Sequence, residues 1–307
     1  MSFSTEIKNE ISRIKSSKSE YIAELSGYAR NNLKIKENEI ELNTENVNVA
    51  KRIISLFKEL YDVNVNIKVT KNLKFKKNNL YILSINKKID FILEDLNILD
   101  KQKNRLLKPH PYLTDNIDDK KAYIRGVFLS SGSINDPKTS RYHMELLLDY
   151  PDEAVFVQRL VNEFDLNSKI LNRDKGYMVY LKEAEKISDF IKIIQANKAV
   201  MYYEDIRVLR DKKNKTNRLN NCEQANIDKV ISSALSQIKD IEKIQDKIGL
   251  EFIDEKLQEA ASYRLKYPET SLLELSKIIS IETDKKITKS GLNHRFRKIR
   301  EIAEKLQ

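Results

Sequence analysis

Two stretches of the chain, LSGYARNNL (residues 25–33) and IRGVFLSSG (residues 124–132), each carry a glycine inside an apolar segment with helical spacing. The two glycines, Gly27 and Gly126, lie 99 positions apart in a chain that has only six glycines. Two of so few glycines at matching points of two helices raise the question of whether the chain contains a repeated unit.

The segments around these two stretches follow one order of elements twice. Between residues 19 and 99, hydrophobic spacing predicts a helix, two strands, a helix, two strands and a closing helix. Residues 118–194 repeat this order, with Pro151 at the start of their middle helix. One more helix, expected over Ser4–Ser17, precedes the first glycine helix, which is expected over Ser19–Asn32. The repetition predicts an α+β fold built by internal duplication.

The last third of the chain is predicted to be helical throughout and separate from the duplicated part. Two prolines in KPHPYL (residues 108–113) divide the two repeats. We expect the boundary with the helical part in a basic linker near residues 211–221. The expected domains are residues 1–108 and 109–215 for the two halves of the duplicated fold, and residues 216–307 for the helical part.

Composition argues against several classes of protein. No window approaches the roughly 18 consecutive apolar residues of a membrane-spanning helix, and the stretch MSFSTEIKNE lacks the features of a signal peptide. The single cysteine, Cys222, cannot form an internal disulfide and fits a reducing compartment. We therefore expect a cytoplasmic protein without a membrane partner.

The net charge of +10 is concentrated near the C-terminus. Residues 207–218, RVLRDKKNKTNR, contain six basic residues and one acidic residue, whereas residues 285–307 contain eight and two. The two segments carry +5 and +6, so the remainder of the chain carries −1. Because a local basic patch is the electrostatic mark of a nucleic-acid partner, this distribution points to the C-terminal third.

Two helices near the C-terminus have the layout of a helix-turn-helix, over about residues 271–305. SLLELSKII is followed by about ten polar residues, which predict a somewhat long turn, and then by SGLNHRFRKIREIAEKL. The apolar residues of the second helix recur every three or four positions and predict one buried stripe: Leu292, Phe296, Ile299, Ala303 and Leu306. We expect the other side of this helix, which starts at Ser290, to face double-stranded DNA.

The polar side of that helix contains the side chains that we expect to contact DNA. Arginine can pair with guanine and asparagine with adenine, while lysine and serine can hold phosphates. The expected DNA-binding residues are Lys289, Ser290, Asn293, His294, Arg295, Arg297, Lys298 and Arg300. The alternative is a basic helix that is solvated on this side.

The basic run that precedes the helical part could add contacts to the DNA backbone that do not depend on sequence. Its candidate phosphate contacts are Arg207, Arg210, Lys212, Lys213, Lys215 and Arg218. The same run could also be a solvated linker, and the sequence leaves both interpretations open.

Four segments of the chain closely resemble the WhiA family. They are SFSTEIKNEI at the start, NRLNNCEQAN (217–226), AASYRLKYPETSLLEL (260–275) and ITKSGLNHRFRKI (287–299). WhiA proteins are DNA-binding regulators of Gram-positive bacteria, linked to sporulation in some members and to cell division and chromosome segregation in others. The resemblance spans almost the whole chain. It implies a duplicated LAGLIDADG homing-endonuclease-like domain, a C-terminal helix-turn-helix, and a role in cell division or transcription regulation at the nucleoid.

The resemblance to LAGLIDADG endonucleases implies a role for the two glycine helices. In those enzymes the helices pack against each other, and glycine lets their backbones approach, a use that Gly27 and Gly126 fit. Each motif ends on an acidic residue that binds the divalent metal for phosphodiester cleavage. Aligned through the glycines, these positions hold Asn32 and Ser131. Because both side chains are neutral, we expect no metal site and no nuclease activity.

Other chemistry finds little support in the sequence. Three dispersed histidines and one cysteine make no zinc pattern, and no glycine-rich phosphate loop is present. We therefore expect no cofactor and no enzyme. Two alternatives stay open, an active metal-dependent endonuclease and an adaptor whose helix-turn-helix binds protein. The duplicated domain could serve DNA backbone contact, ligand sensing or contact with proteins of the division or transcription machinery.

Overall fold

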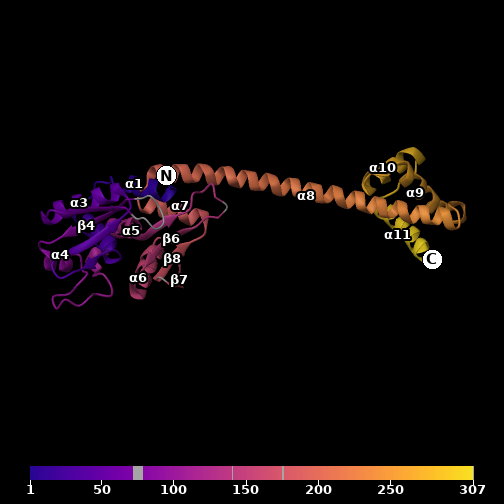
Figure 1. The fold of residues 1–307 in the computed structure, drawn as a ribbon. Coiled ribbons are helices and arrows are strands. Elements are labelled where there is room, and N and C mark those ends of the chain that lie inside the picture. The colour runs from indigo at the N-terminus through magenta and orange to yellow at the C-terminus, as the bar shows by residue number, and fades with distance from the viewer. Residues whose placement is uncertain (72–78, 140, 175, 307) are drawn as a thin grey trace. The chain divides into compact units, whose positions relative to one another are not determined.

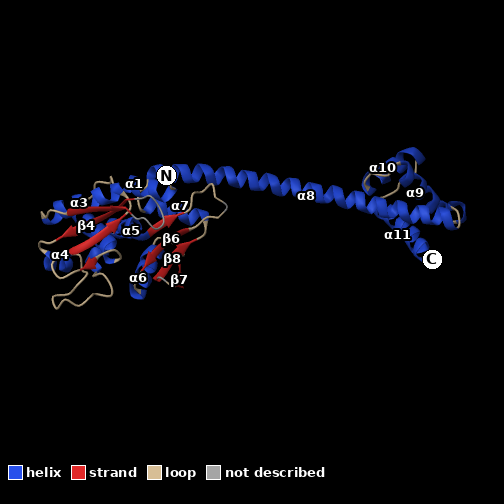
Figure 2. Cartoon of the chain, in the orientation of Figure 1, coloured by secondary structure: helices blue, strands red, loops and turns tan. Residues whose placement is uncertain are grey.

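The computed structural model describes residues 1–71, 79–139, 141–174 and 176–306. These residues form two compact units, called here the N-terminal unit (Met1–Arg210) and the C-terminal unit (Asp211–Gln307). Helices and strands alternate in the N-terminal unit, whereas the described part of the C-terminal unit is helical (Figures 1 and 2).

The N-terminal unit repeats one succession of helices and strands, as the sequence predicts. The first repeat consists of α2 (Lys18–Arg30), β1 (Lys34–Ile35), β2 (Ile40–Thr44), α3 (Val47–Tyr61), β3 (Asn66–Lys71), β4 (Asn79–Ile85) and α4 (Ile89–Asp95). The second repeat consists of α5 (Ile117–Ser131), β5 (Gly132–Ile134), β6 (Met144–Leu148), α6 (Pro151–Asn162), β7 (Lys169–Arg173), β8 (Gly176–Leu181) and α7 (Ala184–Ile193). The α+β class and the duplicated order are confirmed.

Each repeat contains a four-stranded antiparallel sheet, and the strand orders are equivalent. The orders are β1-β2-β4-β3 and β5-β6-β8-β7. Leu42 pairs with Leu83 in the first sheet and Leu146 with Val179 in the second, and all four side chains are fully buried. Residues that alternate with these, such as Glu41, are partly exposed. Each sheet therefore covers a core with one face and turns the other toward solvent.

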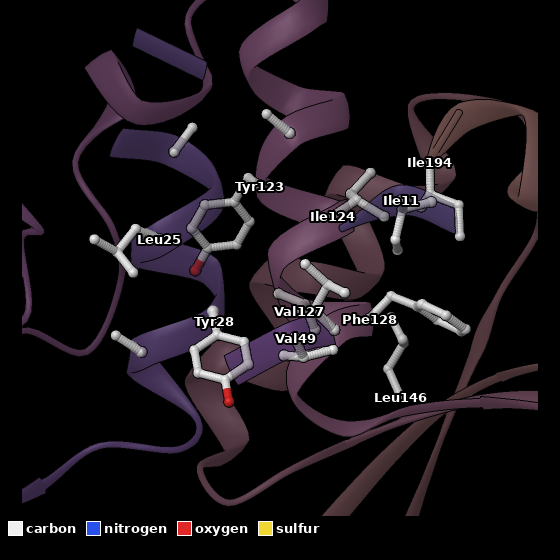
Figure 3. Packing of buried hydrophobic residues seen from close by; sticks show 14 of the residues in the cluster. Ile11, Leu25, Tyr28, Val49, Tyr123, Ile124, Val127, Phe128, Leu146 and Ile194 are labelled. Atoms are coloured by element: carbon white, nitrogen blue, oxygen red, sulfur yellow. The ribbon is translucent and has the colours of Figure 1, made fainter. Parts of the chain in front are cut away.

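Helices α2 and α5 cross at their glycines. A Cβ atom on Gly27 would lie 2.4 Å from the carbonyl oxygen of Tyr123, and one on Gly126 would lie 2.0 Å from that of Glu24. Tyr123 and Glu24 each precede the glycine of their own helix by three positions, so the contact is equivalent in both directions. Figure 3 shows the apolar side chains that surround this crossing. The two backbones meet so closely that only a hydrogen atom fits at either glycine.

Two buried carboxylates connect the repeats through ion pairs. The Glu24 carboxylate of α2 lies 2.7 Å from Nε of Arg125 on α5 and 2.8 Å from Nε of Arg52 on α3. The Glu153 carboxylate of α6 lies 3.5 Å from Nε of Arg30 on α2. Burial raises the pKa of the Glu153 carboxyl, while the charge of Arg30 opposes that shift. Removing one partner of a buried ion pair costs about 3–5 kcal/mol, so both pairs hold the two repeats in one arrangement.

Helix α1 (Phe3–Ile11) precedes the first repeat and is shorter than the sequence indicates. A single helix was expected over Ser4–Ser17. The Ser17 hydroxyl and the Glu20 carboxylate instead form a capping box that begins α2, so the chain leaves the first helix well before this point. The prediction of this boundary was wrong because a serine followed three positions later by a glutamate starts a helix rather than continuing one.

The linker predicted near residues 211–221 is part of a long helix. Helix α8 runs from Asn197 to Lys247 without interruption, so the expectation of a linker was wrong. This stretch contains neither glycine nor proline, the two residues that most readily end a helix. Both units therefore contribute residues to one helix. None of the described helices, α8 included, is long and apolar enough to cross a membrane.

The C-terminal unit has a core of its own. After α8 it contains α9 (Glu255–Lys266), α10 (Leu272–Thr283) and α11 (Lys289–Lys305). The buried apolar residues of this core are Ile241, Ile244, Ile253, Leu257, Ala260, Ala261, Leu275, Ile279, Leu292, Phe296, Ile299 and Ala303. Because every described helix of the unit contributes to this core, α10 and α11 are held at a defined angle.

Replacing Gly126 with alanine should force α2 and α5 apart. The added methyl group would meet a main-chain oxygen at 2.0 Å, and overpacking of this severity costs about 3 kcal/mol. Urea denaturation of the full chain should show this loss in the free energy of unfolding of the N-terminal unit. Gly291→Ala is the matched control, because its Cβ would meet only the Thr288 hydroxyl, at 3.3 Å. Equal destabilisation by both substitutions would contradict the close crossing.

Candidate nucleic-acid interface

The helix-turn-helix is formed by α10 and α11 with a short turn. Helix α10 is capped by Ser271 and continues to Thr283, past the point at which the sequence indicated its end. Residues 284–288 form the turn, which is shorter than expected. The Ser280 hydroxyl accepts a hydrogen bond from the main-chain N–H of Ile287 at 2.9 Å and so ties the turn back to α10.

The apolar stripe of α11 determines which side of this helix faces solvent. Leu292, Phe296, Ile299 and Ala303 are buried in the core of the C-terminal unit, and Leu306 is partly buried against them. The stripe predicted from the sequence is therefore confirmed. The polar residues of α11 lie on the remaining sides of the helix.

All but one of the expected DNA-binding residues are exposed on α11. They are Lys289, Ser290, Asn293, His294, Arg297, Lys298 and Arg300. The Nη2 atom of Arg297 lies 2.8 Å from Nδ1 of His294, one turn earlier on the helix. Arg300 pairs with Glu304, whose carboxylate lies 2.9 Å from its Nε atom. The exposed group is basic, and Arg297 lies near its centre.

Arg295 is turned away from this group. Its Nη1 atom lies 2.7 Å from the carboxylate of Glu259 and donates to the main-chain carbonyl of Lys256 at 3.3 Å, both on α9. The side chain is 18% exposed, as is that of Glu259. Arg295 therefore holds α9 against α11, and this contact competes with any contact to DNA.

A cavity beside α11 is lined by a further basic side chain, Lys256, which the sequence did not indicate. It has a volume of about 360 Å³ and is lined by Lys256 of α9 together with Asp254, His294 and Lys298. Lys256 is exposed and lies next to the polar side of α11. Only the packing of α9 on α11 brings these residues together, so no spacing in the sequence could have revealed Lys256.

The basic run on α8 divides into fixed and exposed side chains. Arg207 forms ion pairs with Glu185 and Glu204, at 3.1 Å and 2.8 Å, and Arg210 donates to the carbonyl oxygen of Pro137 at 2.6 Å. These two arginines are held within the N-terminal unit. The other candidate phosphate contacts are exposed on α8: Lys212, Lys213, Lys215 and Arg218.

Asn32, at the first position where the LAGLIDADG motif would have an acid, forms hydrogen bonds to the main chain of a strand. The side-chain amide of Asn32 accepts from the N–H of Asn43 at 2.7 Å and donates to its carbonyl at 2.9 Å. The amide of Asn31 donates to the carbonyl of Leu147 at 2.6 Å and accepts from the N–H of Asp149 at 2.9 Å. Asn43 belongs to the first sheet and Leu147 to the second. This asparagine clamp, Asn31 with Asn32, attaches the end of α2 to both sheets.

The second such position, Ser131, ends α5. Its hydroxyl is buried and has no hydrogen-bond partner among the described residues. Hard divalent cations are bound mainly by carboxylate oxygens, which neither Ser131 nor Asn32 supplies. In the part of the chain that the structure describes, no group of three or more His, Cys, Asp or Glu side chains could hold a metal ion. The residues at these two positions do not fit a divalent metal.

Comparison with known proteins assigns the chain to a family. It is 43% identical over 314 residues to the "Probable cell division protein WhiA" of Staphylococcus epidermidis, a match that covers 100% of this chain and 98% of that protein. The chain belongs to the WhiA family. A WhiA protein of Bacillus cereus with the same name is also 43% identical, over 311 residues, with the same coverage of both chains.

Models of the WhiA domains match three consecutive segments. The WhiA N-terminal LAGLIDADG-like domain matches residues 18–99, the WhiA LAGLIDADG-like domain residues 120–213, and the WhiA C-terminal HTH domain residues 216–303. The family resemblance and the two-part architecture inferred from the sequence are thus confirmed.

Solved structures of WhiA proteins share the fold. The crystal structure of full-length DUF199/WhiA from Thermatoga maritima matches with a TM-score of 0.61 and 25% identity, covering 100% of this chain and 99% of that chain. The crystal structure of the N-terminal LAGLIDADG domain of DUF199/WhiA covers 63% of this chain and 90% of its own, with a TM-score of 0.52 and 23% identity. The second match concerns the fold alone.

Restoring an acid at the first position should break the asparagine clamp. A carboxylate accepts hydrogen bonds but cannot donate one, so Asn32→Asp removes the bond to the Asn43 carbonyl and places a negative charge at a helix C-terminus. The expected loss is about 1–2 kcal/mol in the free energy of unfolding, measured by urea denaturation. Asn38→Asp adds the same charge at an exposed position and should leave stability unchanged. If Asn32→Asp is as stable as the native chain, the asparagine clamp does not stabilise the fold.

Proposed function

We propose that this WhiA family member binds double-stranded DNA sequence-specifically through α11 and acts in cell division. The observation that carries the proposal is the exposed basic side of α11, whose opposite side is buried in a helix-turn-helix. The helix-turn-helix model over residues 216–303 supports DNA binding. The names of the S. epidermidis and B. cereus relatives support a place in cell division.

The exposed side chains of α11 divide by what they can contact on DNA. Asn293 and Arg297 can each make paired hydrogen bonds to base edges, asparagine to adenine and arginine to guanine. His294 accepts from Arg297 and so orients the guanidinium group before DNA arrives. Lys289 and Lys298 are point charges suited to phosphates. We assign base recognition to the first two residues and placement of the helix on the duplex to the lysines.

The exposed cations of α8 would extend the contact to the DNA backbone. Phosphate contacts raise affinity for every sequence, and each adds to the dependence of affinity on salt. Four α8 side chains suit this role because they are exposed: Lys212, Lys213, Lys215 and Arg218. Arg207 and Arg210 are less suited, since their guanidinium groups are bound within the N-terminal unit.

The N-terminal unit acts, in this proposal, as a scaffold that no longer cleaves DNA. The amide of Asn32 is committed to the main chain of β2, and Ser131 offers one neutral hydroxyl. The wider role follows from the family resemblance: chromosome segregation or transcription regulation at the nucleoid, with partners in the division or transcription machinery.

DNA that the chain binds should stay intact in the presence of Mg²⁺. The residues at both motif ends are neutral, so neither metal binding nor activation of water is available there. Genome-wide mapping of bound DNA would supply the preferred duplex, and gel analysis after incubation would reveal cleavage. An active LAGLIDADG endonuclease with its own target is the positive control. Cleavage at a defined site, abolished by Asn32→Ala and Ser131→Ala, would show that the unit is still a nuclease.

The two neighbouring arginines of α11 should behave differently when removed. Arg297→Ala should weaken binding to the preferred duplex by roughly tenfold or more, about 1–3 kcal/mol, with little change in stability. Arg295→Ala should instead lower stability, because it removes the contact with Glu259. Fluorescence anisotropy against several duplexes measures affinity, and thermal melting measures stability. If Arg297→Ala and His294→Ala both bind DNA as the native chain does at physiological salt, α11 is not the reading helix.

The α8 cations provide the contrasting variant for that experiment. Replacing Lys212, Lys213, Lys215 and Arg218 by glutamine should weaken binding on all duplexes alike and flatten the salt dependence. Arg297→Ala should act mainly on the preferred duplex. The two variants therefore separate backbone contact from base recognition.

A further inference from the structure

A cavity of about 690 Å³ lies in the N-terminal unit beside the two positions that lack metal-binding acids. Its lining includes Lys8 of α1, Asn43 of β2 and Ser130 of α5. Ser130 directly precedes Ser131, and Asn43 is the residue whose main chain Asn32 clamps. The cavity is thus adjacent to both motif ends, although neither Asn32 nor Ser131 is on its lining.

Helix α1 is anchored to both repeats, and this places Lys8 in the cavity. The Ser4 hydroxyl donates to the carbonyl of Ile134 at 2.9 Å and accepts from its N–H at 2.8 Å. On the other side, the side-chain Oδ1 atom of Asn9 accepts a hydrogen bond from the side-chain amide of Asn46 at 2.9 Å. Lys8 lies between these two anchors in the sequence, so both repeats fix the position of its backbone.

Three polar groups on the cavity lining have no partner in the described part of the chain. The Lys8 ammonium forms neither a hydrogen bond nor an ion pair there, and lies 5.7 Å from the ring centroid of Phe128. The Ser130 hydroxyl forms no hydrogen bond there. The Oδ1 atom of Asn43 is buried without a donor. Lys8 and Ser130 are partly exposed residues, so the ammonium and the hydroxyl are both open to a ligand in the cavity.

The charge of the cavity is opposite to that of a metal site. Burial lowers the pKa of the Lys8 ammonium to about 8, and the charge of Glu45 opposes that shift. Glu45 is exposed and is the one carboxylate among the described lining residues. The other titratable group on the lining is the amino terminus at Met1. The lining therefore carries two cationic groups and one exposed carboxylate, a balance that repels a divalent cation and attracts an anion.

We propose that this cavity binds a phosphate group through Lys8 and Ser130. A volume in this range suits a ligand of nucleotide size. The phosphate could belong to a free nucleotide or to the DNA backbone, and both offer the same chemistry to Lys8. The inference does not depend on DNA reading by α11, so Arg297→Ala should bind the anion as the native chain does.

Calorimetric titration of the full chain with sulfate tests the anion site. Sulfate remains a dianion between pH 7 and pH 9, whereas a lysine with a pKa of about 8 loses most of its charge over this interval, so affinity should fall roughly tenfold. Lys8→Met should bind sulfate at least about tenfold more weakly at pH 7 and should show a smaller pH dependence than the native chain. Lys15→Met, an exposed lysine beyond α1, should bind as the native chain does.

Two controls distinguish loss of the anion site from loss of folding: the melting temperature of the variants and a second substitution on the lining. Methionine keeps the apolar contacts of Lys8 and removes a partly buried charge that has no ion pair among the described residues, so Lys8→Met should melt no lower than the native chain. Ser130→Ala should also weaken sulfate binding. The proposal is overturned if the native chain binds no sulfate at millimolar concentrations, or if Lys8→Met and the native chain bind it equally.

Competition experiments then assign the source of the phosphate. If adenosine monophosphate binds the native chain more tightly than inorganic phosphate does, and Lys8→Met abolishes this binding, the ligand is a free nucleotide. Weaker binding of duplex DNA by Lys8→Met, with no preference for the nucleotide over phosphate, identifies the DNA backbone. If Lys8→Met changes none of these affinities, the cavity is not a phosphate site.

Discussion

The close crossing of α2 and α5 is the constraint on which the N-terminal unit depends. Because main chain meets main chain at Gly27 and Gly126, the two helices can take only one register without overlap. That register also pairs Glu24 with Arg125 in the buried interior, and a shift of one turn would break this ion pair between the repeats. Strand β5 begins directly after α5, and β1 follows shortly after α2. The crossing therefore positions both sheets, and it determines which residues lie at the two helix ends.

Periodicity along the chain predicts the face of an element, but not the residue that a distant element brings to that face. It was sufficient for the duplicated order of elements and for the buried stripe of α11. It could not separate Arg295 from Arg297, because only the packing of α9 shows that Glu259 binds the first of them. Asn31 was missed for the same reason, since its partners lie 116 and 118 positions away. The polar composition of residues 211–221 indicated a linker, although nothing in that stretch ends a helix.

The ends of α2 and α5 show how one position can exchange a chemical role for a structural one. An amide both donates and accepts, so Asn32 can close two hydrogen bonds with a single residue of a strand, which a carboxylate cannot do. Metal binding and the clamp are therefore mutually exclusive uses of this position. At this position Asn32 attaches the end of α2 to β2 of the first sheet. Lys8 lies on the lining of the neighbouring cavity.

The exposed stretch of α8 has a thermodynamic consequence for any polyanion that binds it. Side chains over residues 211–229 are exposed, so this part of the helix gains little from packing and depends on its own helical propensity. Lys212 and Lys215, and again Lys215 and Arg218, are three positions apart and repel each other on the helix surface. A bound polyanion neutralises these charges and removes the repulsion. Association and helix formation in this stretch are therefore linked equilibria, in which each makes the other more favourable.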